Sequence, residues 1–159
     1  MMRRATTTNV RITIRINFAS PGIKPVMRFA TIQKLVHGVP YILPEMARDL
    51  YDFILSEKPL HCLELGFAHG ASSCYMAAAL DEIGKGSLTC VDLLPAREWQ
   101  KEPTIETLLG RCNLTHLVAI HREHTSYNWF LKKQIQAQTS NGTCIPCYDF
   151  CFIDGAKHW

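Results

Sequence analysis

The sequence predicts an α/β domain built on a doubly wound, mostly parallel sheet, and three observations carry this prediction. From residue 44 onward, short apolar runs typical of buried strands alternate with segments of helical periodicity, as in successive β-α units. The 159 residues, 47% hydrophobic and 19% charged, are enough for one domain with its own core. The longest charge-free apolar stretch, residues 65–80, is interrupted by glycine and polar residues, so no membrane span is predicted.

Each predicted element has a local reason. Pro44 begins a helix with one apolar face, and Lys58-Pro59 ends it. Gly84 and Gly86 end the next helix, and Ser126 is a predicted cap for the last one. Residues 138–146 are polar and are predicted to form a surface loop. The remaining predicted helices are 71–82, 104–112 and 126–138, and the predicted strands are 60–65, 87–93, 117–120 and 148–153.

Charge is unevenly distributed along the chain. Residues 1–44 carry seven basic and no acidic side chains, which leaves ten basic against 14 acidic side chains in residues 45–159. Residues 10–18 alternate apolar and polar at period two, which predicts a strand or a mobile arm and not a helical targeting peptide. We therefore predict a basic N-terminal arm or strand at 1–27 and a domain at 28–159. The acidic balance of the domain argues against a nucleic-acid partner.

The seven cysteines are an odd number and are spread through apolar segments. This distribution predicts reduced thiols in a cytoplasmic protein and not a disulfide framework. The pair Cys144-Ile-Pro-Cys147 has the spacing of half a zinc site, but no second pair accompanies it. Loop and core thiols are therefore the favoured interpretation.

Residues 62–73 join a predicted strand to a predicted helix and contain two glycines, Gly66 and Gly70. Glycine lets the backbone turn sharply and approach a ligand, and the N–H groups that begin the following helix favour an anionic or polar group. Ser72 adds a hydroxyl donor. The dinucleotide fingerprint G-x-G-x-x-G is absent, because Ala68 stands where it requires a glycine. This difference counts against an NAD enzyme.

Two acidic residues strengthen the prediction of a ligand. Burying Glu64 at the end of an apolar strand is costly without a hydrogen-bond donor, so either a satisfied structural role or a ligand amine is expected. Asp92 ends the next strand, where a carboxylate can accept hydrogen bonds from both hydroxyls of a ribose. A turn cap before Pro95 is its alternative role. Together with the glycine loop, the two acids predict a nucleoside ligand.

Three motifs occur in order: Glu64-x-Gly66-x-x-x-Gly70, the acid at Asp92, and Tyr148-Asp-Phe-Cys-Phe-Ile-Asp-Gly155. They resemble the successive motifs of class I S-adenosylmethionine-dependent methyltransferases, and in particular the small-molecule O-methyltransferases. The resemblance covers residues 40–159. It implies a Rossmann-like sheet of strand order 3-2-1-4 and S-adenosyl-L-methionine as cofactor.

The resemblance also implies roles for single residues of the cofactor site. The loop from Glu64 to Ser72 would hold the methionine part of the cofactor, and Asp92 would bind the ribose. Ser126 and Tyr127 would contact the adenine, although a helix cap and a packed aromatic explain them equally well. The implied cofactor-binding residues are Glu64, Gly66, Ala68, Gly70, Ser72, Asp92, Ser126 and Tyr127.

Candidate catalytic residues come from the end of the last strand. In metal-dependent members of the resembled family, an aspartate comparable to Asp154 holds Mg²⁺ or another divalent cation, which lowers the pKa of a bound hydroxyl. Three positions later the family has its proposed base, which here is Lys157. In the closest subgroup this base is a histidine, and His158 lies one place late. Lys157 and His158 are both retained as candidate catalytic residues.

One part of the family pattern is missing. The family continues with a fifth strand and an antiparallel pair, whereas this sequence stops after the fourth predicted strand. We therefore expect a truncated methyltransferase domain whose fourth strand is an exposed sheet edge, and a homodimer could form through that edge.

The predicted function is S-adenosylmethionine-dependent methyl transfer to a small-molecule hydroxyl, with or without a metal. The alternative is a truncated, inactive nucleoside-binding or interaction domain. A short oxidoreductase is disfavoured because a third loop glycine and a Tyr-x-x-x-Lys pair are both missing. Tyr41, Trp99 and Trp129 are candidates for an acceptor pocket, with packing as their alternative role.

Overall fold

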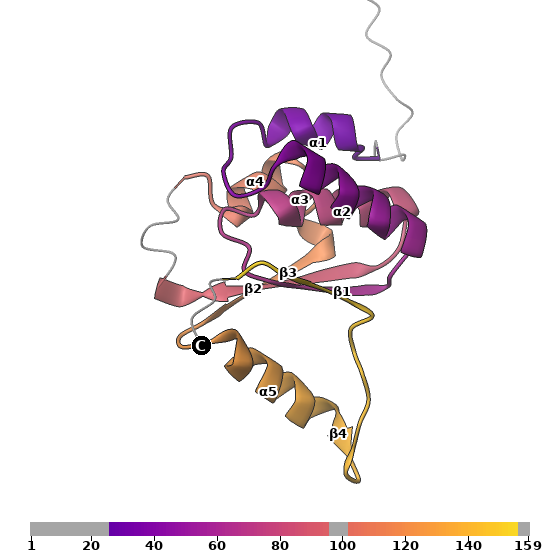
Figure 1. The fold of residues 1–159 in the computed structure, drawn as a ribbon, viewed down its shortest axis with the longest axis vertical. Helices are drawn as coiled ribbons and strands as arrows, with labels where there is room; N and C mark the ends of the chain where they lie inside the picture. Colours follow the sequence, from indigo (N-terminus) through magenta and orange to yellow (C-terminus); the bar gives the residue numbers. More distant parts are fainter. Residues whose placement is uncertain (1–25, 96–101, 156–159) are drawn as a thin grey trace, which may run out of the picture.

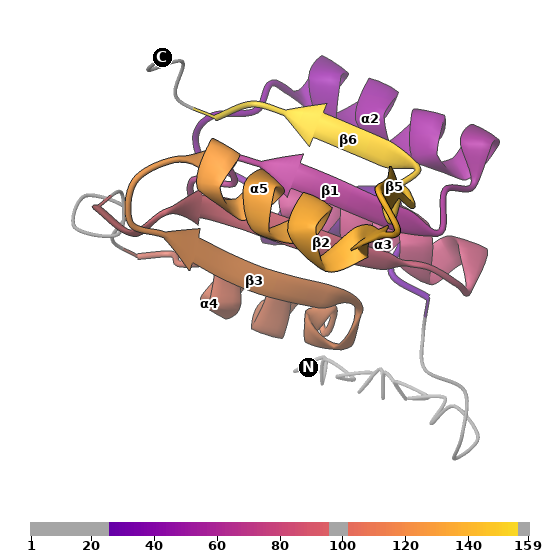
Figure 2. The same cartoon turned by 90° about the horizontal axis from the view of Figure 1, so that it is seen from below.

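Four parallel strands form the central sheet, and helices cover both of its faces (Figure 1). The computed structural model describes residues 26–95 and 102–155. The strands lie in the order β3-β2-β1-β6, as Figure 2 shows. Because β6 is the fourth strand of this sheet along the chain, the predicted order 3-2-1-4 and the Rossmann-like class are confirmed. The strands are β1 (His61–Leu65), β2 (Ser87–Leu93), β3 (Val118–Glu123) and β6 (Phe150–Ile153).

The parallel register brings the carboxyl ends of all four strands to one edge. Glu64 of β1 lies opposite Cys90 of β2 and Phe152 of β6. In α/β sheets of this kind, ligands bind in the crevice outside the carboxyl ends of the strands. The segments that follow β1, β2 and β6 therefore meet where a ligand is expected.

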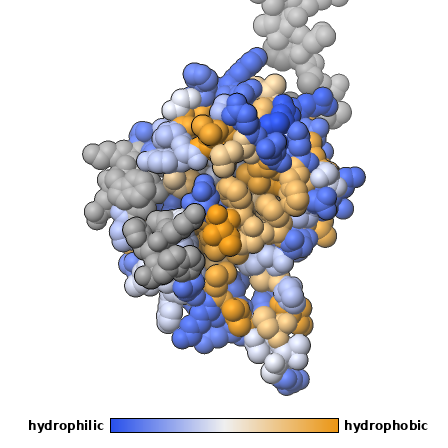
Figure 3. All heavy atoms as spheres, viewed as in Figure 1, coloured by the Kyte–Doolittle hydropathy of each residue, from blue (hydrophilic) through white to orange (hydrophobic). Residues whose placement is uncertain are grey.

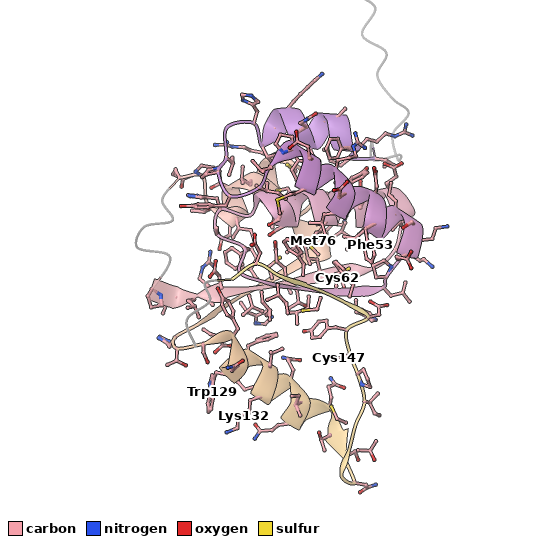
Figure 4. All side chains as sticks on the ribbon, viewed as in Figure 1. Phe53, Cys62, Met76, Trp129, Lys132 and Cys147 are labelled. Atoms are coloured by element: carbon pink, nitrogen blue, oxygen red, sulfur yellow. The ribbon has the colours of Figure 1, made fainter. Side chains whose placement is uncertain are left out.

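Four helices cover one face of the sheet: α1 (Phe29–Leu35), α2 (Pro44–Glu57), α3 (Ala71–Ile83) and α4 (Ile105–Arg111). Helix α3 lies at the centre of this layer, and every residue from Ala71 to Leu80 is buried. Figure 4 shows Met76 and Cys62 between these helices and the sheet. The main hydrophobic core of the protein is this layer.

The other face carries helix α5 (Tyr127–Gln138) and a short hairpin, β4 (Thr139–Ser140) with β5 (Thr143–Cys144). Only one residue of α5, Phe130, is buried. It packs on Leu63, Leu65 and Val91 of the sheet. Figure 4 shows Trp129 and Lys132 projecting from α5 away from the sheet. This second core is small.

The structure differs from the sequence predictions in three elements. Helix α1 was not predicted. Strand β3 continues three residues beyond the predicted end at Ile120, because its polar end still pairs with β2 up to Glu123. The predicted loop at 138–146 contains the hairpin, whose turn residues Asn141 and Gly142 have φ of 51° and 78°. An Asn-Gly pair with positive φ is the preferred turn of a two-residue hairpin loop.

Strand β6 lies at the edge of the sheet, as expected for the fourth strand. Its Ile153 side chain is 71% exposed, and Phe53 of α2 packs on Phe150 with ring centroids 5.1 Å apart. In Figure 3, hydrophobic residues gather over the middle of the face where α2 and β6 lie in Figure 1. Association through this edge stays a prediction.

Several sequence predictions fall wholly or partly on other parts of the chain. The arm at 1–27 lies almost entirely outside the described residues, as do Trp99, Lys157 and His158. The division into an arm and a domain at 28–159 thus stays a prediction. Within residues 26–95 and 102–155, none of the helices has the length and hydropathy of a membrane span.

Candidate functional site

The glycine loop after β1 is shaped by close packing at Gly66. This residue has φ +92°, and a Cβ added to it would lie 2.2 Å from Cα of Gly155, which follows β6. Only glycine fits such an approach of two backbones. The sequence explained Gly66 by closeness to a ligand, whereas the structure shows that it also joins the ends of β1 and β6.

The second glycine places the loop against helix α4. Gly70 has φ +88° and is the N-terminal cap residue of α3. A Cβ added there would lie 2.5 Å from Cγ1 of Ile105. Because α3 begins directly after this loop, the start of this 13-residue helix lies at the carboxyl end of β1.

Glu64 is completely buried, and its carboxylate accepts hydrogen bonds from Ser72, Ser73 and Cys90. Burial raises the pKa of this carboxyl, the three donors lower it, and the charge of Asp154 raises it further, with a net increase. The two serine contacts attach the first turn of α3 to β1. This is the satisfied structural role that the sequence left open, and a contact with the cofactor stays a prediction.

Asp92 connects three segments at the end of β2 and is 5% exposed. Its Oδ2 accepts the N–H of Ala68 in the glycine loop at 2.8 Å. Its Oδ1 accepts the N–H of Leu93 at 2.7 Å and the hydroxyl of Tyr127 at 3.0 Å. A carboxylate is therefore held at the place where the resemblance puts the ribose of the cofactor.

Ser126 and Tyr127 reach the site from the start of α5. The Ser126 hydroxyl accepts the N–H of Trp129 at 3.3 Å, so it is the cap of α5. The Tyr127 ring lies against Gly155, where an added Cβ would lie 2.4 Å from the ring atom Cε2. The predicted contacts with adenine stay predictions, but the structure brings both residues to the same edge as Asp92.

Asp154 follows β6, and its N–H donates to the carbonyl of Leu65 at 2.9 Å. Its side chain is exposed. Within the described ranges, no group of three or more His, Cys, Asp or Glu side chains is arranged to hold a metal ion. The role of Asp154 as a metal ligand stays a prediction.

An aromatic pair at the rim was missed by the sequence interpretation. Tyr41, in the segment before α2, stacks on His69 of the glycine loop with ring centroids 5.9 Å apart and an interplanar angle of 10°. Nδ1 of His69 lies 2.8 Å from the carbonyl oxygen of Pro103. Because a carbonyl only accepts, Nδ1 carries the proton and Nε2 is the acceptor when the ring is neutral. The pair joins residues that no local pattern relates.

Trp129, the other described candidate for the acceptor pocket, does not lie beside the glycine loop. Trp129 is 49% exposed on α5 and pairs with Lys132, whose Nζ lies 5.1 Å from the ring centroid. An apolar cavity of about 200 Å³ lies between α5 and residues 144–148, at the end of α5 opposite Tyr127. Tyr41 is thus the one described candidate for the acceptor pocket that lies beside the glycine loop.

Comparison with known protein families identifies the class of this protein. The family described as "Methyltransferase domain" matches residues 63–158, which include the end of β1, the glycine loop, Asp92 and β6. The chain belongs to this methyltransferase family. No curated protein sequence matches it significantly.

Solved methyltransferase structures share the fold. An O-methyltransferase from Bacillus cereus in complex with SAH has a TM-score of 0.57 at 17% identity, over 80% of this chain and 55% of its own. The O-methyltransferase TomG from Streptomyces achromogenes, in complex with SAM, has a TM-score of 0.53 at 18% identity, over 79% and 52%. The chain thus spans about half the length of these structures.

Proposed function

We propose that the carboxyl edge of the sheet binds S-adenosylmethionine and that the chain forms the cofactor-binding part of an O-methyltransferase acting on a small molecule. The observation that carries this proposal is the buried Asp92 carboxylate at the end of β2, which Ala68 N–H ties to the glycine loop. A carboxylate at this place accepts hydrogen bonds from a ribose. The complexes of two similar structures with SAH and SAM support the choice of nucleoside.

The residues of the edge have different tasks in this proposal. The backbone at Gly66 and Gly70 shapes the loop that holds the methionine part, and the start of α3 supplies N–H groups for its carboxylate. Ser126 and Tyr127 lie beside the adenine. The Tyr41–His69 pair forms one wall on the acceptor side.

The main task of the protein in this reaction is to orient the acceptor relative to the methyl group of the cofactor. When bound, S-adenosylmethionine supplies an electrophilic methyl group on its sulfonium ion. The site would orient an acceptor hydroxyl toward this methyl group, and a base would take the proton of the hydroxyl as its oxygen accepts the methyl group and the sulfonium leaves as a neutral thioether. Lys157 and His158 are the proposed bases. Asp154 is the proposed ligand if a divalent cation assists, and no step here depends on one.

Isothermal titration of the full chain with S-adenosylmethionine and S-adenosylhomocysteine tests the proposal. We expect both to bind the wild-type chain and to bind Asp92→Ala at least about tenfold more weakly, since a charge-assisted hydrogen bond contributes about 1.5–3 kcal/mol. Asp52→Ala is the matched control, because its carboxylate is exposed on α2 and pairs with Arg48 at 3.4 Å. Circular dichroism checks that each variant is folded.

The opposite result has a defined meaning. If the folded wild-type chain binds neither nucleoside, the cofactor assignment is wrong for this chain. The alternative function, a methyltransferase-like domain that acts through its surface and not through turnover, would then be favoured. The exposed edge of β6 is the first place to look for such an interaction.

A further inference from the structure

Tyr127 spans the site from one side to the other. Its hydroxyl donates to Oδ1 of Asp92 at the end of β2, and its ring lies against Gly155 after β6. Between these two strands lies β1, and Gly66, which directly follows β1, touches Gly155. The tyrosine side chain therefore lies across the carboxyl end of β1, which is where the proposed function places the cofactor.

The hydrogen bonds of Asp92 show what a ribose would have to displace. Each oxygen of a carboxylate offers about two acceptor positions. Oδ1 already accepts from the Leu93 N–H and from the Tyr127 hydroxyl. The Leu93 N–H belongs to the backbone of β2 and cannot move away, whereas the hydroxyl is carried by a rotatable side chain. A ribose hydroxyl that approaches Oδ1 must therefore replace the tyrosine.

The surroundings of Tyr127 allow this exchange. It is the first residue of α5, and the cap of that helix is made by Ser126, so a rotation of the Tyr127 side chain leaves the helix intact. The side chain is half-buried and belongs to the small core under α5. On its other side the ring packs closely on the backbone of Gly155, where an added Cβ would lie 2.4 Å from Cε2, so the exchange includes the loss of this contact.

We propose that Tyr127 competes with the ribose of the cofactor for Asp92, so that binding requires the tyrosine to give up its hydrogen bond and leave Gly155. This inference rests on the proposed function, because it assumes that the ribose binds at Asp92. It makes Tyr127 an affinity-determining residue, since the same hydroxyl stabilises the chain without cofactor and opposes cofactor binding.

Titration of Tyr127→Phe with S-adenosylhomocysteine tests the competition. The variant keeps the ring and removes the hydroxyl, so we expect the Kd to fall about three- to tenfold, the equivalent of one hydrogen bond that no longer has to be broken. Without cofactor, the same variant should unfold at a lower temperature. Tyr148→Phe is the matched control, because Tyr148 packs on the same small core, and its Kd should equal that of the wild type.

A double-mutant cycle tests the contact without any ligand. Urea unfolding of Tyr127→Phe, Asp92→Asn and the double variant should give effects that are not additive, since the two groups share one hydrogen bond. Additive effects would overturn the contact on which the inference stands.

The titration separates the failure of this inference from the failure of the proposed function. If the wild type and Tyr127→Phe bind with the same Kd, or the variant binds more weakly, the competition is wrong while the cofactor site stands. If the wild type, Tyr127→Phe and Tyr148→Phe all fail to bind S-adenosylmethionine and S-adenosylhomocysteine, the cofactor assignment fails, and the competition fails with it.

Discussion

Helices α1–α4 and helix α5 cover the two faces of one sheet, but they bury very different cores. Among the described residues, the face under α1–α4 has a cluster of 23 buried side chains, whereas the face under α5 has four. Hydrophobic burial is the main favourable term in folding. The α1–α4 face therefore supplies most of the stability, and the α5 face can carry residues such as Tyr127 that serve the site.

The largest contrast between the faces is expected in thiol reactivity. All seven cysteines are free, and Cys62 lies in the large core whereas Cys144 is exposed in the hairpin. Burial and the nearby charge of Asp149 raise the pKa of Cys62 to about 12. Because the thiolate is the nucleophile, we expect iodoacetamide at pH 8 to modify Cys144 at least about a hundredfold faster than Cys62, as read by peptide mass spectrometry. Equal rates of modification at Cys62 and Cys144 would contradict the difference in burial between the two faces.

Leucine truncation measures the two cores directly. Leu80 of α3 is fully buried in the large core, and Leu131 of α5 is half-buried beside the small one. We expect Leu80→Ala to lower the free energy of unfolding by about 3 kcal/mol and Leu131→Ala by about 1 kcal/mol, because the cost follows the cavity left behind. Urea unfolding monitored by circular dichroism gives both values. Similar losses would show that the faces contribute equally.

Asp149 attaches β6 to β1 where the chain returns from the α5 face. Its carboxylate accepts the N–H groups of Leu60 at 2.8 Å and His61 at 2.9 Å. Slight burial raises the pKa of this carboxyl, but these two donors lower it more, so the folded pKa is below the unfolded value of 3.8. The contribution is therefore present above pH 3.8 and is lost as the pH falls through the folded pKa.

Replacing this carboxylate tests the attachment. We expect Asp149→Asn to lower the free energy of unfolding by about 1 kcal/mol at pH 7, since the group is exposed and solvent weakens its hydrogen bonds. The difference from the wild type should shrink as the pH falls below 3.8. Asp52→Asn, which removes only the exposed pair with Arg48, is the control and should change stability little. A loss that is independent of pH would rule out the charge as its cause.

The last comparison concerns the two helix caps. Thr104 caps α4 on the large core, and Ser126 caps α5 on the small one. Each alanine variant should lose about 1 kcal/mol. Hydrogen exchange should distinguish them, because α5 has one buried residue and should open locally in Ser126→Ala, whereas α4 should stay protected in Thr104→Ala. Equal local opening of both helices would weaken the comparison.

Most of the framework could be predicted from the sequence. Alternating apolar runs and helical periodicity located β1, β2, α2, α3 and α5 within a few residues, because these elements depend on local patterning. Helix α1 was missed because its seven residues bury only Phe29 and Ile32, too few to make a helical pattern. The hairpin was missed because its strands have two residues each, although Asn141-Gly142 signals its turn.

The candidate site was predicted less completely. Motif order identified the glycine loop and Asp92, and the resemblance supplied the strand order that brings them together. Neither the motifs nor the resemblance revealed that the N–H of Ala68 binds Asp92 or that Tyr41 stacks on His69. These contacts depend on loop conformations, and no short-range pattern encodes them.

The amino-acid sequence by itself determined the class of this protein, the succession of its strands and helices, and the acids and glycines at the strand ends. Only the tertiary structure decided that Gly66 packs on Gly155 and that Tyr127 holds Asp92. These pairs are far apart along the chain. They meet because β6 and β2 lie on either side of β1, and the strand register decides which backbone and side-chain atoms come into contact there.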